Sequence, residues 1–539
     1  MSRPIPTIDM LFMLAESRDT PQHVAGVLLF DNPTAKSGWT IQDLVQRYRD
    51  AKPIYPFNVI PKLSLSARPR WVDAADMDMT YHVQHHALPA PGSDKQLDEL
   101  VERWHSVVFD RGQPLFQLCI VEGVSNNRFA IYVKIHHSII DGASAIARIL
   151  AGVSADPTDP IGLPFYAVKV GTKPREPAPK GLVSLLGGTT NDLLNRYKVA
   201  MDLSTSFWKK ALARAGGAPA SGSLPFEAPM TLFNVPILHG RSFARVTMPL
   251  EPMRQAGKAA GGTLNDVAMA LVDSAVHTYL RERKQPLDKR LLALVPVSLR
   301  EPGDLEATTR ISAVVVPMGD SESAMAPRLK QIVEGMKDAK TEVKGMSKAA
   351  AGGYSVALYA LAQGLGKLGV KRPLANMVIS NVPGANKQMY LGGSPMLAVY
   401  PVNVLSVGMG LSVTLVSNAG QVNVGVTSQN KTIPDPQHLA SLMVQALEEL
   451  TSGKSPAPAP AAQPVEDVPV KRVRKAPAKK EVAVVAKPRR AAAKAASAPA
   501  KKAPARKRAK PVAPVAAGAP ADVPADTTPT VVPAETPAT

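Results

Sequence analysis

The chain has 539 residues, too many for one ordinary domain, and 45% of them are hydrophobic, which is enough for a substantial core. The single cysteine, Cys119, excludes an intrachain disulfide framework and a cysteine-rich metal site. The net charge of +19 is uneven, because residues 451–539 carry a net charge of +11 and the remainder carries +8. The N-terminus lacks a basic start followed by a long apolar run, so no signal peptide is predicted.

The first half of the chain alternates strand-like and helix-like segments. Residues 23–30 and 129–135 are rich in branched and aromatic side chains, which predicts strands. Apolar residues recur at helical spacing over 95–109 and predict a helix. We therefore expect a first lobe over residues 1–185, followed by a helical connection over 186–229.

The second half resumes the same alternation. Residues 241–250 and 290–299 predict strands, and 264–283 predict a long helix between them. The stretch 388–430 contains no Asp, Glu, Lys or Arg, but glycine and proline interrupt it. Short apolar runs of this kind predict buried strands rather than a membrane-spanning helix. We expect a second lobe over residues 230–452.

The C-terminal segment, residues 453–539, consists mainly of Ala, Pro, Lys and Arg and contains no aromatic residue. Such a composition buries too little apolar surface to offset the entropy of ordering, which predicts a disordered tail. Its basic part, 470–511, could attract anionic lipid headgroups or nucleic-acid phosphates. A solubilising extension with no specific partner is the alternative, and the sequence leaves these three open.

One strand-like segment runs directly into His136 and His137, and the pair Asp141-Gly142 follows four residues after the second histidine. Neighbouring side chains on a strand point to opposite faces, so one imidazole can face a cavity while the other packs behind it. An imidazole takes a proton from an alcohol or amine near neutral pH. The arrangement argues against both rings binding one metal, and no Cys/His cluster completes a metal site, so none is predicted.

Other residues near the motif have structural and functional interpretations. We expect Asp141 to brace the loop and Gly142 to allow a tight turn. A second pair, His85-His86, lacks the Asp-Gly and is interpreted as structural. Asn265 stands near the start of a predicted helix, where its amide could donate to a developing oxyanion or simply cap the helix.

The motif H-H-x-x-x-D-G resembles that of acyltransferases that use coenzyme A or a carrier protein as acyl donor, including chloramphenicol acetyltransferase-like enzymes and peptide condensation domains. The resemblance implies an α/β fold with two chloramphenicol acetyltransferase-like lobes, mixed sheets, flanking helices and an active-site channel between the lobes. It narrows to the bacterial wax ester synthase/diacylglycerol acyltransferase family and spans roughly residues 4–450. The further segments that carry it are 114–123, 263–270, 296–300 and 380–393.

Two departures from the family pattern bear on substrate preference. The family's Pro-Leu-Trp is Pro114-Leu115-Phe116 here, and its Met-His is Gln22-His23. These differences concern the choice of acyl chain or alcohol, not the chemistry. We take Pro114, Leu115 and Phe116 as candidates for substrate binding.

The resemblance implies direct acyl transfer from acyl-CoA, a co-substrate, to diacylglycerol or a long-chain alcohol, with no acyl-enzyme and no cofactor. His137 would be the general base, His136 a supporting residue and Asn265 an oxyanion donor. The residues implied to support the site structurally are Asp141, Gly142, Asp266 and Arg300, with Arg300 as the expected partner of Asp141.

Because diacylglycerol and long-chain alcohols are located in membranes, we expect a cytoplasmic protein associated peripherally with the inner membrane face or with lipid inclusions. One alternative is a carrier-protein-dependent condensation-type acyltransferase. Another is a non-catalytic lipid-inclusion protein tethered to DNA by the basic tail. The sequence does not decide between triacylglycerol and wax ester as the main product.

Overall fold

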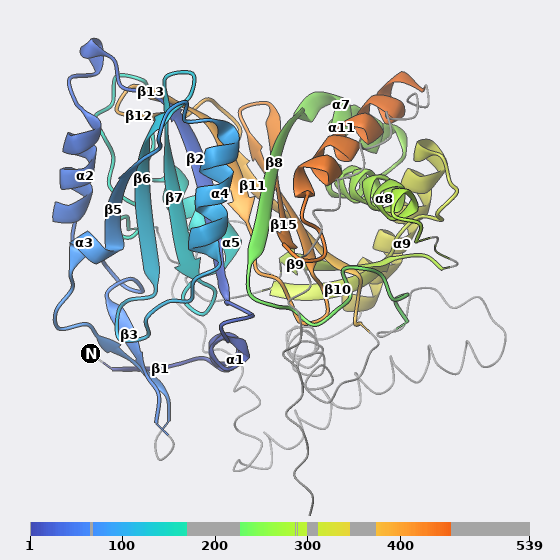
Figure 1. Ribbon diagram of the computed structural model, residues 1–539, viewed down its shortest axis with the longest axis horizontal. Coiled ribbons are helices and arrows are strands. Elements are labelled where there is room, and N and C mark those ends of the chain that lie inside the picture. Colours follow the sequence, from blue (N-terminus) through green and yellow to red (C-terminus); the bar gives the residue numbers. More distant parts are fainter. Residues whose placement is uncertain are drawn as a thin grey trace, which may run out of the picture. The chain divides into compact units, whose positions relative to one another are not determined.

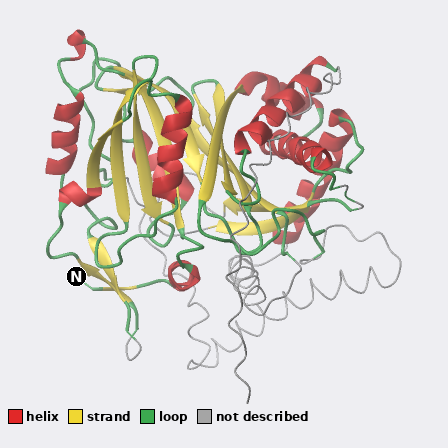
Figure 2. Ribbon diagram, in the orientation of Figure 1, coloured by secondary structure: helices red, strands yellow, loops and turns green. Residues whose placement is uncertain are grey.

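The computed structural model describes residues 2–64, 68–169, 227–285, 287, 289–298, 311–344 and 373–453. The predicted connection up to residue 226, Arg300 and the tail beyond Gly453 lie outside the described residues. Within them the chain forms two six-stranded sheets and one three-stranded sheet, with helices packed against the larger sheets (Figure 1, Figure 2). The predicted mixed α/β architecture with two sheet-rich lobes is confirmed.

The first lobe is built on a mixed sheet in the order β12-β13-β2-β7-β6-β5. Its strands β2 and β7 pair antiparallel from His23 opposite His136 to Asp31 opposite Arg128. Helix α4 packs its apolar side chains on one face of the sheet, whereas α2 and α5 pack on the other. The elements are β2 (His23–Asp31), η1 (Ala35–Ser37), α2 (Ile41–Asp50), α3 (Met79–His82), β5 (Val83–Ala87), α4 (Asp94–His105), β6 (Phe116–Val124), β7 (Arg128–His136) and α5 (Gly142–Leu150).

The second lobe is built on a sheet in the order β10-β9-β11-β14-β15-β8. Helix α8 is buried almost all round, because α7, α9 and α11 surround it and its apolar residues continue on every side. The elements are β8 (Arg241–Pro249), α7 (Leu250–Ala259), α8 (Leu264–Glu282), β9 (Leu292–Ser298), β10 (Ile311–Pro317), α9 (Met325–Lys344), β11 (Met377–Ala385), β14 (Leu411–Asn418), β15 (Gln421–Gln429) and α11 (Pro436–Ser452).

Two strands from the second half of the sequence belong to the sheet of the first lobe. They are β12 (Tyr390–Leu391) and β13 (Ser394–Val402), and β13 pairs antiparallel with β2. The indole N–H of Trp39 also donates to the carbonyl of Gly392 at 2.7 Å. The prediction that the second lobe spans 230–452 is therefore wrong for β12 and β13. β13 pairs with the edge of β2 that would otherwise be unpaired.

The uncharged stretch 388–430 contains β12 through β15, so the predicted buried strands are confirmed. Within the described ranges, no helix combines the length and the apolar character needed to cross a membrane.

A small sheet and one helix lie beside the end of the first sheet. The small sheet has the order β1-β4-β3, with β1 (Arg3–Pro4), β3 (Val59–Lys62) and β4 (Arg70–Asp73). Helix α1 (Thr7–Ala15) follows β1 directly. The side chains of Asp9, Met13 and Glu16 lie on one face of this segment and are buried, whereas Leu14 is 65% exposed.

Candidate active site

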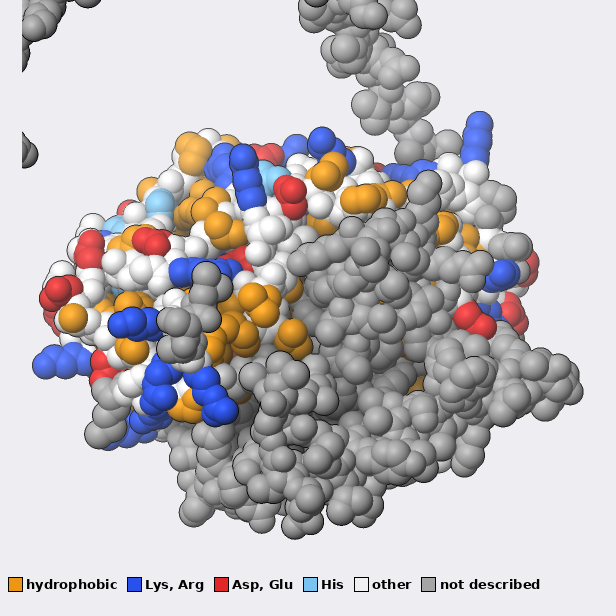
Figure 3. Space-filling model, turned by 90° about the horizontal axis from the view of Figure 1, so that it is seen from below, with side chains coloured by type: hydrophobic (Ala, Val, Ile, Leu, Met, Phe, Trp, Pro, Cys, Tyr) orange, Lys and Arg blue, Asp and Glu red, His pale blue; other side chains and the backbone are white. Residues whose placement is uncertain are grey.

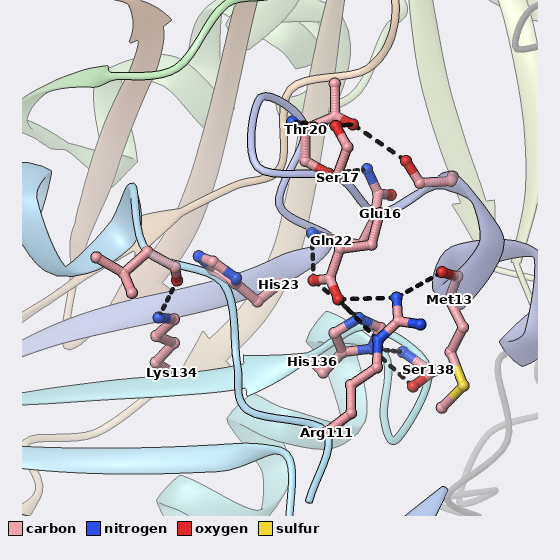
Figure 4. A network of polar contacts seen from close by, with 12 residues as sticks. Met13, Glu16, Ser17, Thr20, Gln22, His23, Arg111, Lys134, His136 and Ser138 are labelled. Atoms are coloured by element: carbon pink, nitrogen blue, oxygen red, sulfur yellow. Dashed lines mark hydrogen bonds and ion pairs between the residues drawn. The ribbon is translucent and has the colours of Figure 1, made fainter. Parts of the chain in front are cut away.

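The two histidines of the motif lie where β7 leaves the first sheet. Figure 4 shows His136 among its polar neighbours. The backbone N–H of His136 donates to the carbonyl of Leu115 at 3.0 Å. The backbone N–H of His137 donates to the carbonyl of Gln22, just before β2, at 2.8 Å. Bonds to segments on both sides of β7 thus fix the point at which each imidazole leaves the backbone.

The ring of His136 is fully buried, and both of its nitrogen atoms face polar groups. Nδ1 lies 2.7 Å from the hydroxyl of Ser138 and accepts the backbone N–H of Ser138 at 3.1 Å. Nε2 lies 3.3 Å from Oε1 of Glu16. Because Nδ1 is an acceptor, the proton of the neutral ring is on Nε2, facing the carboxylate. His136 therefore has no nitrogen available to a substrate.

Several hydrogen-bond donors surround the buried carboxylate of Glu16, as Figure 4 shows. Its Oε1 accepts the backbone N–H of Gln22 at 3.3 Å, and its Oε2 accepts Nη2 of Arg111 at 3.1 Å. Burial raises the pKa of Glu16, but His136, Gln22 and Arg111 outweigh it and hold this pKa below its ordinary value. The carboxylate is therefore ionised near neutral pH.

The ring of His137 has different surroundings. It stacks on the ring of Phe12, with the centroids 4.3 Å apart and the planes 13° from parallel. Its Nδ1 is buried and meets no hydrogen-bond partner on another described residue. Burial lowers the pKa of His137, although its own backbone carbonyl and Asp141 act in the opposite direction. A neutral imidazole near pH 7 is the state that a general base requires.

Asp141 and Gly142 begin helix α5 rather than a tight turn. Asp141 is the N-cap residue, and its Oδ1 accepts the backbone N–H of Ser144 at 2.9 Å. Gly142 is the first helical residue, and an added Cβ would lie 3.8 Å from Val382, an ordinary contact. The expectation that Gly142 is needed for a turn is therefore wrong. Arg300, the expected partner of Asp141, lies outside the described residues.

Asn265 is not the cap of helix α8. Thr263 occupies the N-cap position, and its N–H and hydroxyl donate to the carboxylate of Asp266 at 2.7 and 2.8 Å. The amide of Asn265 donates to the sulfur of Met269 at 3.6 Å, one turn along the same helix. Among the described residues no direct hydrogen bond joins Asn265 to His137, and the role of Asn265 as an oxyanion donor stays a prediction.

The segment Pro114-Leu115-Phe116 is buried in the first lobe. The ring of Phe116 packs on Phe57 and Tyr166 in the core, with centroids 5.5 and 5.0 Å away. Core aromatic side chains thus surround the ring of Phe116, and its contact with substrate stays a prediction. Leu115 contributes through its backbone carbonyl, which holds His136.

A second polar cluster lies behind the histidine pair. Lys134 is buried, and its ammonium donates to the carbonyls of Trp104 and Val107 at 3.0 and 2.5 Å, at the end of α4. Burial lowers the pKa of Lys134 to about 8. His105 accompanies it, and its Nε2 lies 3.2 Å from the carbonyl of Asn403 in the second half of the chain. These bonds attach the end of α4 to β7 and to the segment that directly follows β13.

The second histidine pair, His85 and His86, has different surroundings from the pair in the motif. His85 lies 3.3 Å from Glu122, and the ring of His86 packs against Trp104. Neither ring contacts the polar network around Glu16. Across the described part of the chain, no group of three or more metal-ligating side chains comes together.

Sequence reasoning missed Phe12, Glu16, Arg111 and Ser138. The sequence does contain one relevant signal, because Glu16 is a lone carboxylate at the end of the apolar run 10–15. Its partner, however, lies 120 residues away, and no local pattern indicates that pairing.

Comparisons with known proteins show which family this chain is similar to. Residues 5–268 match the wax ester synthase/diacylglycerol acyltransferase catalytic domain, and residues 308–451 match the C-terminal domain of the same family. The Mycobacterium tuberculosis protein named "Probable diacyglycerol O-acyltransferase Tgs4" is 33% identical over 459 residues, which cover 83% of this chain and 96% of that protein. The "O-acyltransferase WSD" of Acinetobacter baylyi is 31% identical over 453 residues, covering 83% and 96%.

Solved structures show the same fold. The wax ester synthase/diacylglycerol acyltransferase of Marinobacter aquaeolei is 27% identical and superposes with a TM-score of 0.66, covering 84% of this chain and 99% of that one. The starter condensation domain of rhizomide synthetase superposes with a TM-score of 0.53 at 14% identity, covering 84% and 95%, which shows the shared fold alone. The chain is thus an acyltransferase and belongs to the wax ester synthase/diacylglycerol acyltransferase family.

Proposed function

We propose that this protein transfers a fatty acyl group from acyl-CoA to the hydroxyl of diacylglycerol or of a long-chain alcohol, making triacylglycerol or wax ester. One observation carries the proposal. His137, directly after β7, is partly buried and has a lowered pKa, and its neighbour His136 is held by Ser138 and Glu16. The names of the relatives support the same reaction and disfavour both the condensation-type enzyme and the non-catalytic tether.

In this reaction the imidazole of His137 acts first as a general base and then as a general acid. His137 removes the proton of the acceptor hydroxyl while the oxygen attacks the thioester carbonyl, and a C–O bond forms. The tetrahedral intermediate then collapses, the C–S bond breaks, and the imidazolium returns the proton to the departing thiolate. No group on the protein is acylated, so one histidine serves both steps.

The first test measures free thiol release from palmitoyl-CoA in the presence of hexadecanol or dipalmitoylglycerol. We expect thiol release that depends on at least one acceptor, with the matching ester detected by mass spectrometry. Thiol release that needs no acceptor, or ester formation only from an acyl carrier protein, would contradict the proposal.

We infer that the protein works at a cytoplasmic lipid surface, either the inner membrane face or a lipid inclusion, and that the small sheet approaches this surface. Arg3, Lys62 and Arg70 are exposed on its strands, and Leu63, directly after β3, is 40% exposed. Figure 3, which views this side, shows hydrophobic side chains beside Lys and Arg side chains. Basic side chains attract anionic headgroups, and an exposed leucine can enter the interface.

We expect Leu63→Asp to lower binding to vesicles of phosphatidylglycerol and phosphatidylcholine by about tenfold, because burying a leucine contributes roughly 1.5–3 kcal/mol. Sedimentation with the vesicles measures the bound fraction. The matched control is Leu397→Asp on β13, where the leucine is also 40% exposed. Equal binding by both variants would overturn the assignment of the small sheet.

A further inference from the structure

Helix α1 contacts both histidines of the motif. Phe12 lies in α1 and Glu16, four residues on, is its C-cap residue, whose backbone N–H donates to the carbonyl of Phe12 at 3.1 Å. Side chains four apart in a helix lie on the same face, one turn apart. Their partners, His137 and His136, are consecutive and diverge at the end of a strand. One helical turn therefore spans the distance between two rings that point in different directions.

The contact of Phe12 with His137 is a flat stack. With centroids 4.3 Å apart and planes 13° from parallel, the phenyl ring covers one face of the imidazole. Such a stack restricts rotation of the smaller ring and keeps water from that face. The faces of the His137 ring are thus not equivalent, and an acceptor hydroxyl must reach a ring nitrogen at the edge of the ring, because the nitrogen lone pair lies in the ring plane.

The contact of Glu16 with His136 fixes the turn that begins at His136 and ends at Ile139. The carboxylate faces Nε2 at 3.3 Å, which leaves Nδ1 to accept from Ser138. The backbone N–H of Ile139 then donates to the carbonyl of His136 at 3.0 Å and closes a turn. His137 lies inside this turn, so the orientation of His136 determines the position from which the side chain of His137 extends.

The end of helix α1 is itself held in place. Nη2 of Arg111 donates to the carbonyl of Met13 at 2.7 Å as well as to Glu16, and the hydroxyl of Thr20 donates to the carbonyl of Ala15 at 3.0 Å. Arg111 precedes β6, so the helix is attached to the same sheet that carries the histidines. A rigid attachment is what a positioning element requires.

We propose that α1 is the positioning element of the histidine pair, with Phe12 orienting and shielding the base His137 and Glu16 fixing the supporting His136. The role of His137 as base rests on the proposed function. Phe12 and the C-cap residue Glu16 are both positioning residues, because each acts through an imidazole.

Phe12→Ala is expected to lower kcat by about tenfold, because a loosely held base reacts from fewer productive orientations. It is also expected to move the acid limb of the kcat/KM profile to higher pH. Burial lowers the pKa of His137, so uncovering the ring lets that pKa rise and the base becomes protonated at a higher pH. The titratable groups that face the ring or its partner are His136, Asp141 and Glu16.

Two matched variants make the Phe12 test specific. Phe12→Tyr keeps a flat ring and is expected to retain both the rate and the pH profile. Leu14→Ala truncates an exposed residue on another face of the same helix and is expected to leave both unchanged. A Phe12→Ala profile that coincides with that of Leu14→Ala would overturn the role of Phe12.

Glu16→Gln is expected to lower kcat by about 10- to 100-fold while KM for palmitoyl-CoA stays within about twofold, because the base is misplaced but the donor site is untouched. The amide has one acceptor oxygen, whereas the two carboxylate oxygens accept from Gln22 and Arg111 and face Nε2 of His136. Glu251→Gln, which neutralises an exposed carboxylate on α7, is the control. Unchanged kcat, or a loss in KM alone, would overturn the role of Glu16.

The outcomes separate this proposal from the function beneath it. If His137→Ala retains acyl transfer, the proposed base is wrong whatever the α1 variants do. If His137→Ala is inactive but Phe12→Ala and Glu16→Gln match their controls, the function stands and the positioning role of α1 is wrong.

Discussion

Replacing His137 by alanine is expected to lower kcat for thiol release from palmitoyl-CoA by about 10²- to 10⁴-fold, the range for loss of a positioned general base. The other buried imidazole of the motif cannot substitute for it. Nδ1 of His136 is bonded to Ser138, and its Nε2 faces Glu16. The loss should appear with both hexadecanol and dipalmitoylglycerol as acceptor, because deprotonation of the hydroxyl is common to both.

The matched control is His86→Ala. His86 belongs to a second histidine pair of the same lobe, packs on Trp104 and contacts none of the residues around Glu16. It should retain activity. Comparable loss in both variants would show that the effect is structural, and full activity in His137→Ala would move the base to another residue.

Replacing Arg328 by methionine is expected to destabilise the fold by about 3–5 kcal/mol, the range for breaking a buried ion pair. Nη1 of Arg328 donates to Oδ2 of Asp273, and both side chains are buried between α8 and α9. The same oxygen accepts the N–H of Gly319 at 3.1 Å, and His277 lies 3.4 Å from the other oxygen. Removing the guanidinium leaves a charge in the core without its cation. Urea unfolding monitored by circular dichroism measures the loss.

Two further variants test the cause. Combining Arg328→Met with Asp273→Asn removes both charges and is expected to recover part of the lost stability. Arg290→Met breaks an exposed pair with Asp320, where the side chains are 41% and 50% exposed, and should cost less than about 1 kcal/mol. If Arg328→Met and Arg290→Met lose the same stability, the buried pair does not hold α8 to α9.

Local sequence patterns predicted the elements but not all of their partners. Branched and aromatic residues over 23–30 and 129–135 predicted the strands β2 and β7, because a central strand buries both faces. Helix α8 followed from apolar spacing over 264–283. The placement of β13 did not follow, because pairing of a strand near residue 400 with β2 depends on contacts between distant segments and not on composition.

The site divides in the same way. The adjacent histidines and the capping Asp141 are local, so their spacing indicated a reaction centre at the end of a strand. The partners of the rings are not local, since Phe12 and Glu16 come from a helix that precedes the motif by 120 residues. The packing of Phe116 among core aromatic side chains was not predicted, because an aromatic residue near the motif looks the same in sequence whether it lines a core or a substrate site.

The central claim is that the ring of His137 receives the proton of the acceptor hydroxyl. A crystal structure of the protein with a non-hydrolysable acyl-CoA analogue and hexadecanol tests it most directly. We predict the hydroxyl oxygen within about 2.6–3.2 Å of a ring nitrogen of His137, on the side not covered by Phe12. A hydroxyl bound elsewhere, with no path to this ring, would contradict the account.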